Sequence, residues 1–265
     1  MYSIIGIMLQ QLLSQALKKL KVSEFDVLYL YSDLRELGKL KFQNVNKEVF
    51  LDQILSELLK LDCTVIVPTF SYTTEGIFHP KSTPTRLGAL NAYVLKRKDI
   101  IRSNHPLFSH ASIGSNSFLL EKIGKSAFGK QSLYSRLITT TNLRSAFLYL
   151  GRPVSAGNTM PHYIEQIHGV EYRFEKDFPV KVLMENQTFE TGYSAFVRKQ
   201  DNVSNDYSFS FKLASNDLYS QGAVSEVFLK GKFTNISIVE IPAFYSILSR
   251  GLNSNSSYFL KNSLV

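Results

Sequence analysis

The stretch Val27-Leu-Tyr-Leu-Tyr31 is short, apolar and bounded by polar residues, which is typical of a buried strand. Residues 46–60 follow with apolar side chains at helical spacing, and Thr64-Val-Ile-Val67 then reads as a second strand that stops at Pro68. A strand, a helix and a strand at this separation predict a crossover, which joins parallel strands. The sequence therefore favours an α/β fold with a central mixed, largely parallel sheet flanked by helices.

The rest of the chain adds further elements and then changes character beyond Phe178. Residues 69–84 form a long polar and aromatic loop, and loops of this length in a compact domain are often functional. Phe147-Leu-Tyr-Leu150 predicts another buried strand, and a helix is expected to begin near Asn158. We expect one domain over residues 1–265 with a C-terminal antiparallel β-rich portion. The other expected elements are a helix over 87–98, strands over 180–184, 189–196 and 207–211, a helix within 213–229, a strand over 236–241, a helix over 243–252 and a loosely held tail over 253–257.

The net charge of the chain bears on whether it binds nucleic acid or a small polyanion. The net charge is +8 and the isoelectric point is about 9.4. Lys96-Arg97-Lys98 is the nearest approach to a basic cluster, and it is too short to indicate a nucleic-acid-binding surface. An ordinary basic surface and attraction to a polyanionic small molecule both remain open.

Cysteine usage and the N-terminus bear on the compartment. Cys63 is alone, so no disulfide forms within one chain, which favours a reducing compartment and a cytoplasmic protein. Its apolar surroundings predict an inert buried thiol. Met1 to Leu20 is apolar, but it lacks the positive start of a signal peptide, and glutamines interrupt it. We expect an amphipathic helix there and no membrane span.

The pair His162 and Glu165 carries the clearest chemical signal. Asn158 is a good N-cap and Pro161 suits a first turn, so both residues fall on one face of a helix. A carboxylate beside an imidazole raises its pKa and can hold one tautomer, which makes a better general base. Spacing alone also fits an ordinary surface pair. His168 falls on the opposite face, so the pattern does not favour a metal site.

Polar residues follow three of the expected strands. Ser32 and Asp33 come directly after the first, Thr69 to Tyr72 after the second and Gly151 to Ser155 after a third. Ligands of open α/β sheets bind at the carboxyl ends of strands, so these exits predict one cleft. His105 lies in a polar loop, where it either binds a ligand or packs on Pro106. The chain has no GxGxxG, Walker lysine or GxSxG motif, which counts against dinucleotide enzymes, nucleotide-triphosphate hydrolases and α/β-hydrolases.

Six motifs between about Val27 and Phe174 resemble, in the same order, those of the aminoglycoside 3-N-acetyltransferase family of coenzyme A-dependent acyltransferases. They are Tyr31-Ser32-Asp33-Leu34 with Leu37-Gly38, Pro68-Thr69-Phe70-Ser71-Tyr72, Phe78-His79-Pro80 with Thr83-Pro84 and Gly88-Ala89, Arg102-Ser103-Asn104-His105-Pro106 with Ser109, Phe128-Gly129 with Ser132 and Arg136-Leu137, and Asn158-Thr159 with His162-Tyr-Ile-Glu165. The chain departs from the family pattern at Tyr31, where His is usual, at His79, where Asp is usual, and at Pro161.

The resemblance implies roles for individual residues. His162 would be the general base and Glu165 its orienting carboxylate, with Thr69 or Thr159 as hydrogen-bond donors to the oxyanion. Acetyl-CoA or another acyl-CoA would be the donor, and no metal is expected. Residues 27–174 would form the catalytic core, and residues 178–265 a more divergent portion. The cofactor-binding residues would be Ser32, Asp33, Leu34, Thr83, Arg102, Ser103, His105, Phe128 and Gly129.

The resemblance leaves open which amine substrate accepts the acyl group. Coenzyme A and nucleotide-linked amino sugars are polyanions that suit a basic protein, whereas aminoglycosides are polycations. We therefore expect N-acylation of a nucleotide-linked amino sugar in bacterial surface-polysaccharide synthesis. The alternatives are an aminoglycoside acetyltransferase that confers antibiotic resistance and a non-catalytic ligand-binding protein on the same scaffold. A homo-oligomer is possible, and no nucleic-acid partner is expected.

Overall fold

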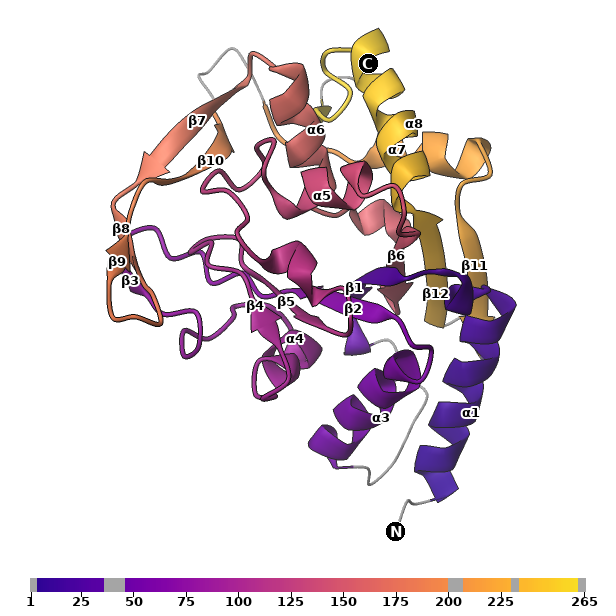
Figure 1. Cartoon of the computed structure of the whole chain (residues 1–265). Coiled ribbons are helices and arrows are strands. Elements are labelled where there is room, and N and C mark those ends of the chain that lie inside the picture. The colour runs from indigo at the N-terminus through magenta and orange to yellow at the C-terminus, as the bar shows by residue number, and fades with distance from the viewer. Residues whose placement is uncertain (1–3, 36–45, 200–206, 230–233, 262–265) are drawn as a thin grey trace.

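A computed structural model describes residues 4–35, 46–199, 207–229 and 234–261. Its largest sheet has seven strands in the order β11-β12-β6-β1-β2-β5-β4 (Figure 1). The three central strands β6, β1 and β2 run parallel, and every other neighbouring pair in this sheet is antiparallel. The predicted mixed α/β sheet is confirmed. Its strands are β1 (Val27–Ser32), β2 (Thr64–Pro68), β4 (Ile101–Arg102), β5 (His110–Ile113), β6 (Ser145–Leu150), β11 (Ser225–Leu229) and β12 (Thr234–Glu240).

The crossover between β1 and β2 forms as the sequence predicts. Helix α3 (Lys47–Leu59) begins after Asn46, whose side chain accepts a hydrogen bond from the backbone N–H of Glu48 at 2.8 Å. The two strands pair in parallel, with Val27 opposite Thr64. The apolar face of α3 is buried against the sheet, so the helical spacing of the sequence corresponds to a packed face.

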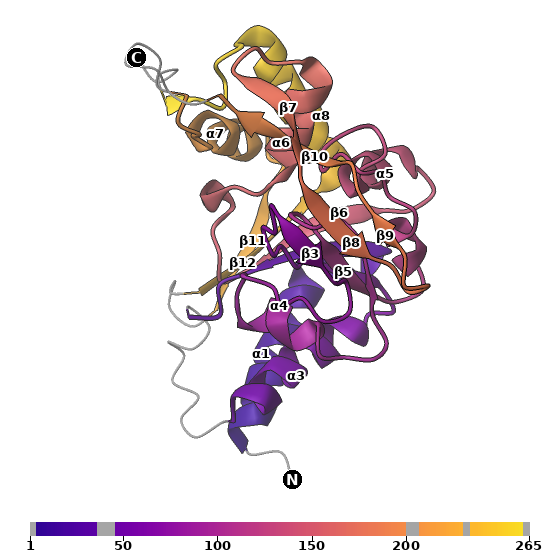
Figure 2. The ribbon, with the colours of Figure 1, turned by 90° about the vertical axis from the view of Figure 1, so that its left-hand side faces the viewer.

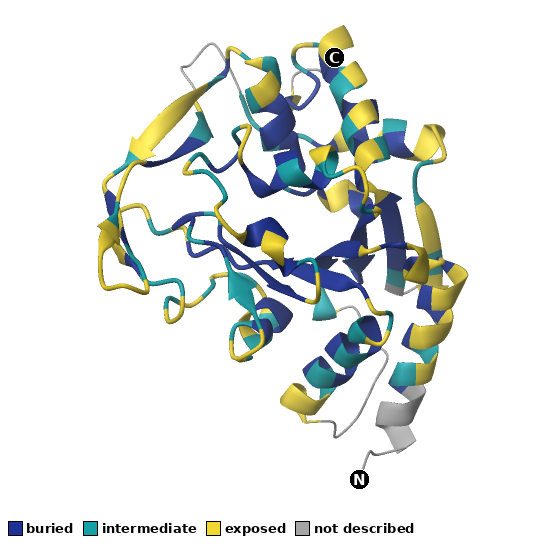
Figure 3. Ribbon diagram, viewed as in Figure 1, coloured by how far each residue is buried: buried dark blue, intermediate teal, exposed yellow. Residues whose placement is uncertain are grey.

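Successive side chains of the central strands point to opposite faces of the sheet, and the two faces differ in chemistry. Leu28 and Leu30 of β1 face an aliphatic layer, whereas Tyr29 and Tyr31 face an aromatic one. Figures 1 and 3 show helices on both faces, with their buried sides turned toward the sheet. The aliphatic face carries α1 (Ile4–Lys19), α3 and α4 (Ala89–Val94). The aromatic face carries α5 (Leu133–Thr139), α6 (Met160–His168) and α8 (Ile241–Ser254).

Two smaller sheets lie beside the central one (Figure 2). The first pairs β7 (Arg173–Phe178) with β10 (Tyr193–Arg198) in antiparallel orientation. The second contains β3 (Gly76–Phe78), β8 (Val180–Leu183) and β9 (Phe189–Glu190). The predicted antiparallel β-rich portion is present. The expected strand over 189–196 is divided in two at Gly192, which has a positive φ of 82° that favours glycine.

Two expectations about the C-terminal third are wrong, one for residues 207–211 and one for the tail. Residues 207–211 form no strand, because Phe209 makes only an isolated bridge with Leu260 while its ring packs inward. The helix expected within 213–229 is present as α7 (Lys212–Ser220), and residues 225–229 pair with β12. The tail is not loose, because α8 continues to Ser254 and residues 258–260 are buried in the core.

The packing of this tail gives a testable prediction. A Cβ at Gly251 of α8 would come within 2.3 Å of the Tyr258 ring, whose hydroxyl donates to Asp217 at 2.6 Å. Gly251→Ala should lower the free energy of unfolding by about 1–3 kcal/mol through overpacking, although alanine has the better helix propensity by about 1 kcal/mol. Urea unfolding measures the change.

A double-mutant cycle provides the control for this prediction. In a Tyr258→Ala background the clash is absent, so Gly251→Ala should stabilise the protein. Equal effects of Gly251→Ala in the two backgrounds would contradict the packing of the tail.

Candidate active site

His162 lies in the first turn of α6, beside Glu165. Its Nδ1 is 2.8 Å from Glu165 Oε2. The N-cap is Thr159 and not the expected Asn158, although the side chain of Asn158 accepts a hydrogen bond from Met160 N–H at 2.9 Å, and Pro161 occupies the first turn. The His162 side chain keeps 22% of its surface exposed, whereas Glu165 is fully buried. This is therefore not the ordinary surface pair that spacing alone allows.

Glu165 has two further partners that the sequence motifs do not indicate. Tyr172 donates its hydroxyl to Oε1 at 3.0 Å, and Arg173 Nε lies 2.7 Å from Oε2. Burial opposes ionisation of Glu165, but His162 and Arg173 outweigh it and hold the pKa of the carboxyl below its usual value. Glu165 is thus a buried carboxylate with its charge compensated. In the sequence, the one feature that could have indicated these partners is the dipeptide Tyr172-Arg173, a few residues after the predicted helix.

The surroundings of His162 set its proton positions. The rings of Phe128 and Phe209 meet it edge-on, with centroids at 5.4 and 5.3 Å. Burial lowers the pKa of His162, and Glu165 partly offsets that effect. Because an ionised Glu165 can only accept a hydrogen bond, the neutral ring carries its proton on Nδ1, donates it in the hydrogen bond to Glu165, and leaves a lone pair on Nε2. Nε2 is then the atom that can take up a proton.

Three other predicted site residues, Thr159, Phe128 and Gly129, lie near α6. Thr159 precedes His162 by one helical turn and contacts the hydroxyls of Tyr31, at 3.3 Å, and of Tyr134. Phe128 packs on the His162 ring, as described above. The backbone of Gly129 passes close to Ser126, because a Cβ on Gly129 would lie 3.0 Å from the Ser126 side chain.

The strand exits of β1 and β6 are adjacent, as predicted. Asp33 N–H donates to Leu150 O at 2.8 Å, which joins the two exits, and Ser32 is the last residue of β1. Arg35 donates two hydrogen bonds to the Asp33 carboxylate and is the main cause of its lowered pKa, with a smaller effect from Arg152. The side chain of Leu34 packs against the aliphatic core. Leu37 and Gly38 of the same motif lie outside the described residues.

A second group of predicted residues braces the loop after β2. Arg102 donates to the carbonyls of Thr69 and Thr83 at 2.9 and 2.5 Å. Thr69 is fully buried, and its hydroxyl faces Ser109 at 3.1 Å. Ser103 Oγ accepts the N–H of His110 at 2.9 Å. Burial lowers the pKa of Arg102 to about 10.

His105 is neutral and fully engaged with backbone. Its Nδ1 accepts from the N–H groups of Leu107 and Phe108, and Nε2–H donates to Ser194 O at 3.1 Å. Burial lowers its pKa to about 4. Phe108 packs between the rings of His105 and Phe128, so it links the second group to the His162 side of the site.

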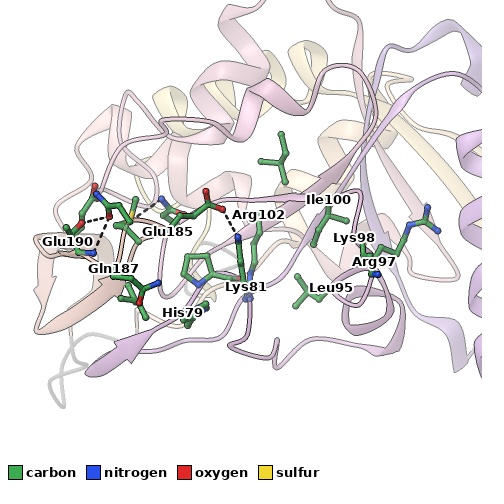
Figure 4. Close-up of a pocket in the computed structure, with 17 residues that line it drawn as sticks. His79, Lys81, Leu95, Arg97, Lys98, Ile100, Arg102, Glu185, Gln187 and Glu190 are labelled. Atoms are coloured by element: carbon green, nitrogen blue, oxygen red, sulfur yellow. Dashed lines mark hydrogen bonds and ion pairs between the residues drawn. The ribbon is translucent and has the colours of Figure 1, made fainter.

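A sizeable cavity lies apart from His162, which is not among its lining residues. It has a volume of about 840 Å³ between the loop at His79, the segment before β4 and the β8–β9 hairpin (Figure 4). Lys81 pairs with Glu185 across it at 2.9 Å. Arg102 is the single predicted site residue in its wall.

Three further expectations concern a metal site, a membrane span and the single cysteine. Among residues 4–35, 46–199, 207–229 and 234–261, no three His, Cys, Asp or Glu side chains gather as a metal site would require. No helix in those ranges is both long and apolar enough to cross a membrane. Cys63 is buried, and burial raises the pKa of its thiol to about 11, as expected for an inert cysteine.

Comparison with known proteins places this chain in a family. Residues 30–246 match the sequence pattern of the family described as aminoglycoside 3-N-acetyltransferase. The chain belongs to this family. This is the family of N-acetyltransferases that the six motifs indicated. No curated protein sequence matches the chain significantly.

Solved structures of aminoglycoside acetyltransferases share the fold. AAC(3)-IIb has a TM-score of 0.74 at 18% identity, with 95% of this chain and 98% of that chain covered. AAC-IIIb with CoASH has 0.73 at 14% identity, covering 95% and 97%. AAC-VIa bound to sisomicin has 0.72 at 16% identity, covering 92% and 97%.

The pH dependence of kcat/KM tests the His162–Glu165 pair. His162 must be neutral to act as a base, so activity should fall as pH falls through its pKa, at a point below the ordinary value of about 6.5. Glu165→Gln removes the carboxylate that raises this pKa and leaves the charge of Arg173 nearby. The acid limb should move to lower pH, and kcat should fall about tenfold or more.

Glu171→Gln is the matched control, because Glu171 is an exposed carboxylate near the same helix. It should leave the acid limb in place. An acid limb that stays fixed or moves upward in Glu165→Gln would show that Glu165 does not set the pKa of the base.

Proposed function

We propose that this chain transfers an acetyl group from acetyl-CoA to an amine of an aminoglycoside-type amino sugar. The observation that carries the proposal is the partly exposed imidazole of His162, held at 2.8 Å by a buried, ionised Glu165 in a chain of this family. A ligand-binding protein without catalysis would have no use for a buried charge beside an accessible base. The intact pair therefore favours an enzyme.

The chemistry follows from the proton positions. The acceptor amine forms a bond to the thioester carbonyl carbon while His162 Nε2 takes the proton from its nitrogen. Glu165 stabilises the resulting imidazolium through Nδ1–H. The C–S bond then breaks, the thiolate of coenzyme A leaves, and His162 returns the proton to it. The products are an N-acetyl amino sugar and free coenzyme A.

The residues at the strand exits suit the donor substrate. Arg35 and Arg152 both act on Asp33 at the ends of β1 and β6, so two guanidinium groups stand near one carboxylate. Guanidinium groups bind phosphate well, and coenzyme A is a polyanion. We assign the donor to this edge with Ser32 and Leu34, and the bracing of the loop after β2 to Arg102, Ser103 and His105.

Two observations support the acceptor. The net charge of +8 favoured a nucleotide-linked sugar, but the charge near α6 is not uniformly positive. Glu175 and Asp177 are exposed on β7, and Gln166 of α6 donates to Glu175 at 2.8 Å. Similar structures include one bound to sisomicin and one with CoASH. An aminoglycoside acceptor is thus better supported than a nucleotide-linked one in polysaccharide synthesis.

An acceptor panel tests the proposal directly. Purified protein with acetyl-CoA should release free coenzyme A in the presence of sisomicin-like aminoglycosides, and mass spectrometry should show one added acetyl group on the sugar. Transfer to nucleotide-linked amino sugars and not to aminoglycosides would overturn the proposed acceptor. Absence of transfer to any amine would overturn the proposed activity.

His162→Ala tests the role of the base. It should lower kcat/KM by about 10²–10⁴, the usual contribution of a general base, with the fold retained by circular dichroism. His168→Ala is the matched control, because it changes a histidine in the last turn of the same helix. Near-normal turnover of His162→Ala with the true acceptor would show that another group removes the proton.

A further inference from the structure

A chain of buried hydroxyl groups leads from the core to the catalytic helix. Tyr29 and Tyr134 contact each other at 3.4 Å through their hydroxyls, Tyr134 contacts Thr159 Oγ1, and Tyr31 contacts the same oxygen at 3.3 Å. Tyr29 and Tyr134 are fully buried and Tyr31 is 8% exposed. Thr159 is the most exposed member and lies one helical turn before His162.

The imidazole of His110 lies beside this chain of hydroxyl groups and donates a hydrogen bond to it. Burial lowers its pKa to about 3, so the ring is neutral and carries one N–H. Its Nε2 is 3.5 Å from the Tyr134 hydroxyl, and its buried Nδ1 has no partner. An unpaired buried N–H is rarer than an unfilled acceptor, so the hydrogen belongs on Nε2 and is donated to Tyr134.

The hydrogen count then gives the chain a direction. Four hydroxyls supply four hydrogens, and the three hydroxyl contacts of 3.4 Å or less between them use three. A fourth hydrogen on Tyr29 would be buried without a partner, which costs stability. The economical arrangement has Tyr29 donating to Tyr134 and Tyr134 donating to Thr159. The remaining hydrogen is on Thr159 or Tyr31, at the exposed end.

We infer that Tyr134 is a positioning residue, which directs one hydroxyl hydrogen of the Thr159–Tyr31 pair at the acyl carbonyl oxygen during transfer. The inference rests on the proposed acetyl transfer. Thr159 and His162 are three residues apart on one side of α6, so the donor and the base approach the same reacting group. Negative charge develops on the carbonyl oxygen as the amine adds, and a fixed donor there stabilises the transition state more than the substrate.

Kinetics of hydroxyl-deletion variants test this role once wild-type transfer has been measured. Thr159→Val should lower kcat by about 10²-fold, the usual effect of losing such a donor, whereas Thr159→Ser should restore most of it. Tyr134→Phe should lower kcat by about tenfold, because Thr159 loses its orienting partner. KM for acetyl-CoA and the acid limb of the pH profile should stay unchanged.

Tyr258→Phe is the matched control, since it also removes one buried tyrosyl hydroxyl, which bonds to Asp217. Both phenylalanine variants should lose similar thermal stability, but Tyr258→Phe should keep its kcat. Equal kcat values in the two variants would overturn the inference.

The direction of the hydroxyl chain has a readout that is independent of activity. In proton NMR, Thr159→Val should shift the slowly exchanging Tyr134 hydroxyl signal and leave that of Tyr258 unmoved. An unmoved Tyr134 signal would refute the direction. If the wild-type protein transfers acetyl to no amine, the proposed function fails, and this spectrum still decides whether the chain delivers its hydrogen to Thr159.

Discussion

The buried charge of Glu165 is the constraint on which the site depends. An isolated carboxylate in a protein interior costs several kcal/mol, so it persists only with partners. Its partners come from two elements, with His162 on α6 and Tyr172 and Arg173 at the start of β7. Arg173 also donates to Phe196 O of β10 at 3.1 Å. The small β7–β10 sheet therefore holds α6 in place through Glu165.

The two faces of the central sheet have different roles, one in stability and one in positioning the helix that carries His162. One face is aliphatic and packs on α1, α3 and α4, where it serves stability. The other carries the tyrosines of β1 and β6 toward α5 and α6. Tyr149 of β6 accepts a hydrogen bond at 2.8 Å from Asn158, whose side-chain oxygen also accepts from Met160 N–H at the start of α6. Hydroxyls from the sheet thus anchor the first turn of the helix that carries His162.

Local patterns predicted the parts of the structure that depend on neighbours in sequence. The crossover from β1 to β2, the start of α6 and the His162–Glu165 pair all follow from spacing, capping and family motifs. The partners Tyr172 and Arg173 did not, because β7 was not recognised as a strand and its packing on α6 is a tertiary contact. The segment 207–211 has the period of a strand, yet among the described residues its one β-bridge joins Phe209 to Leu260. Net charge is a weak guide to the acceptor, because it does not describe the charge near one helix.

The central claim is that Glu165 holds neutral His162 with its proton on Nδ1 and its lone pair on Nε2. Long-range proton–nitrogen correlation NMR of the histidine rings, recorded above the pKa of His162, measures this tautomer directly. The account predicts a protonated Nδ1 and an unprotonated Nε2. A proton found on Nε2 would leave no lone pair facing the acceptor and would contradict the assignment of His162 as the base.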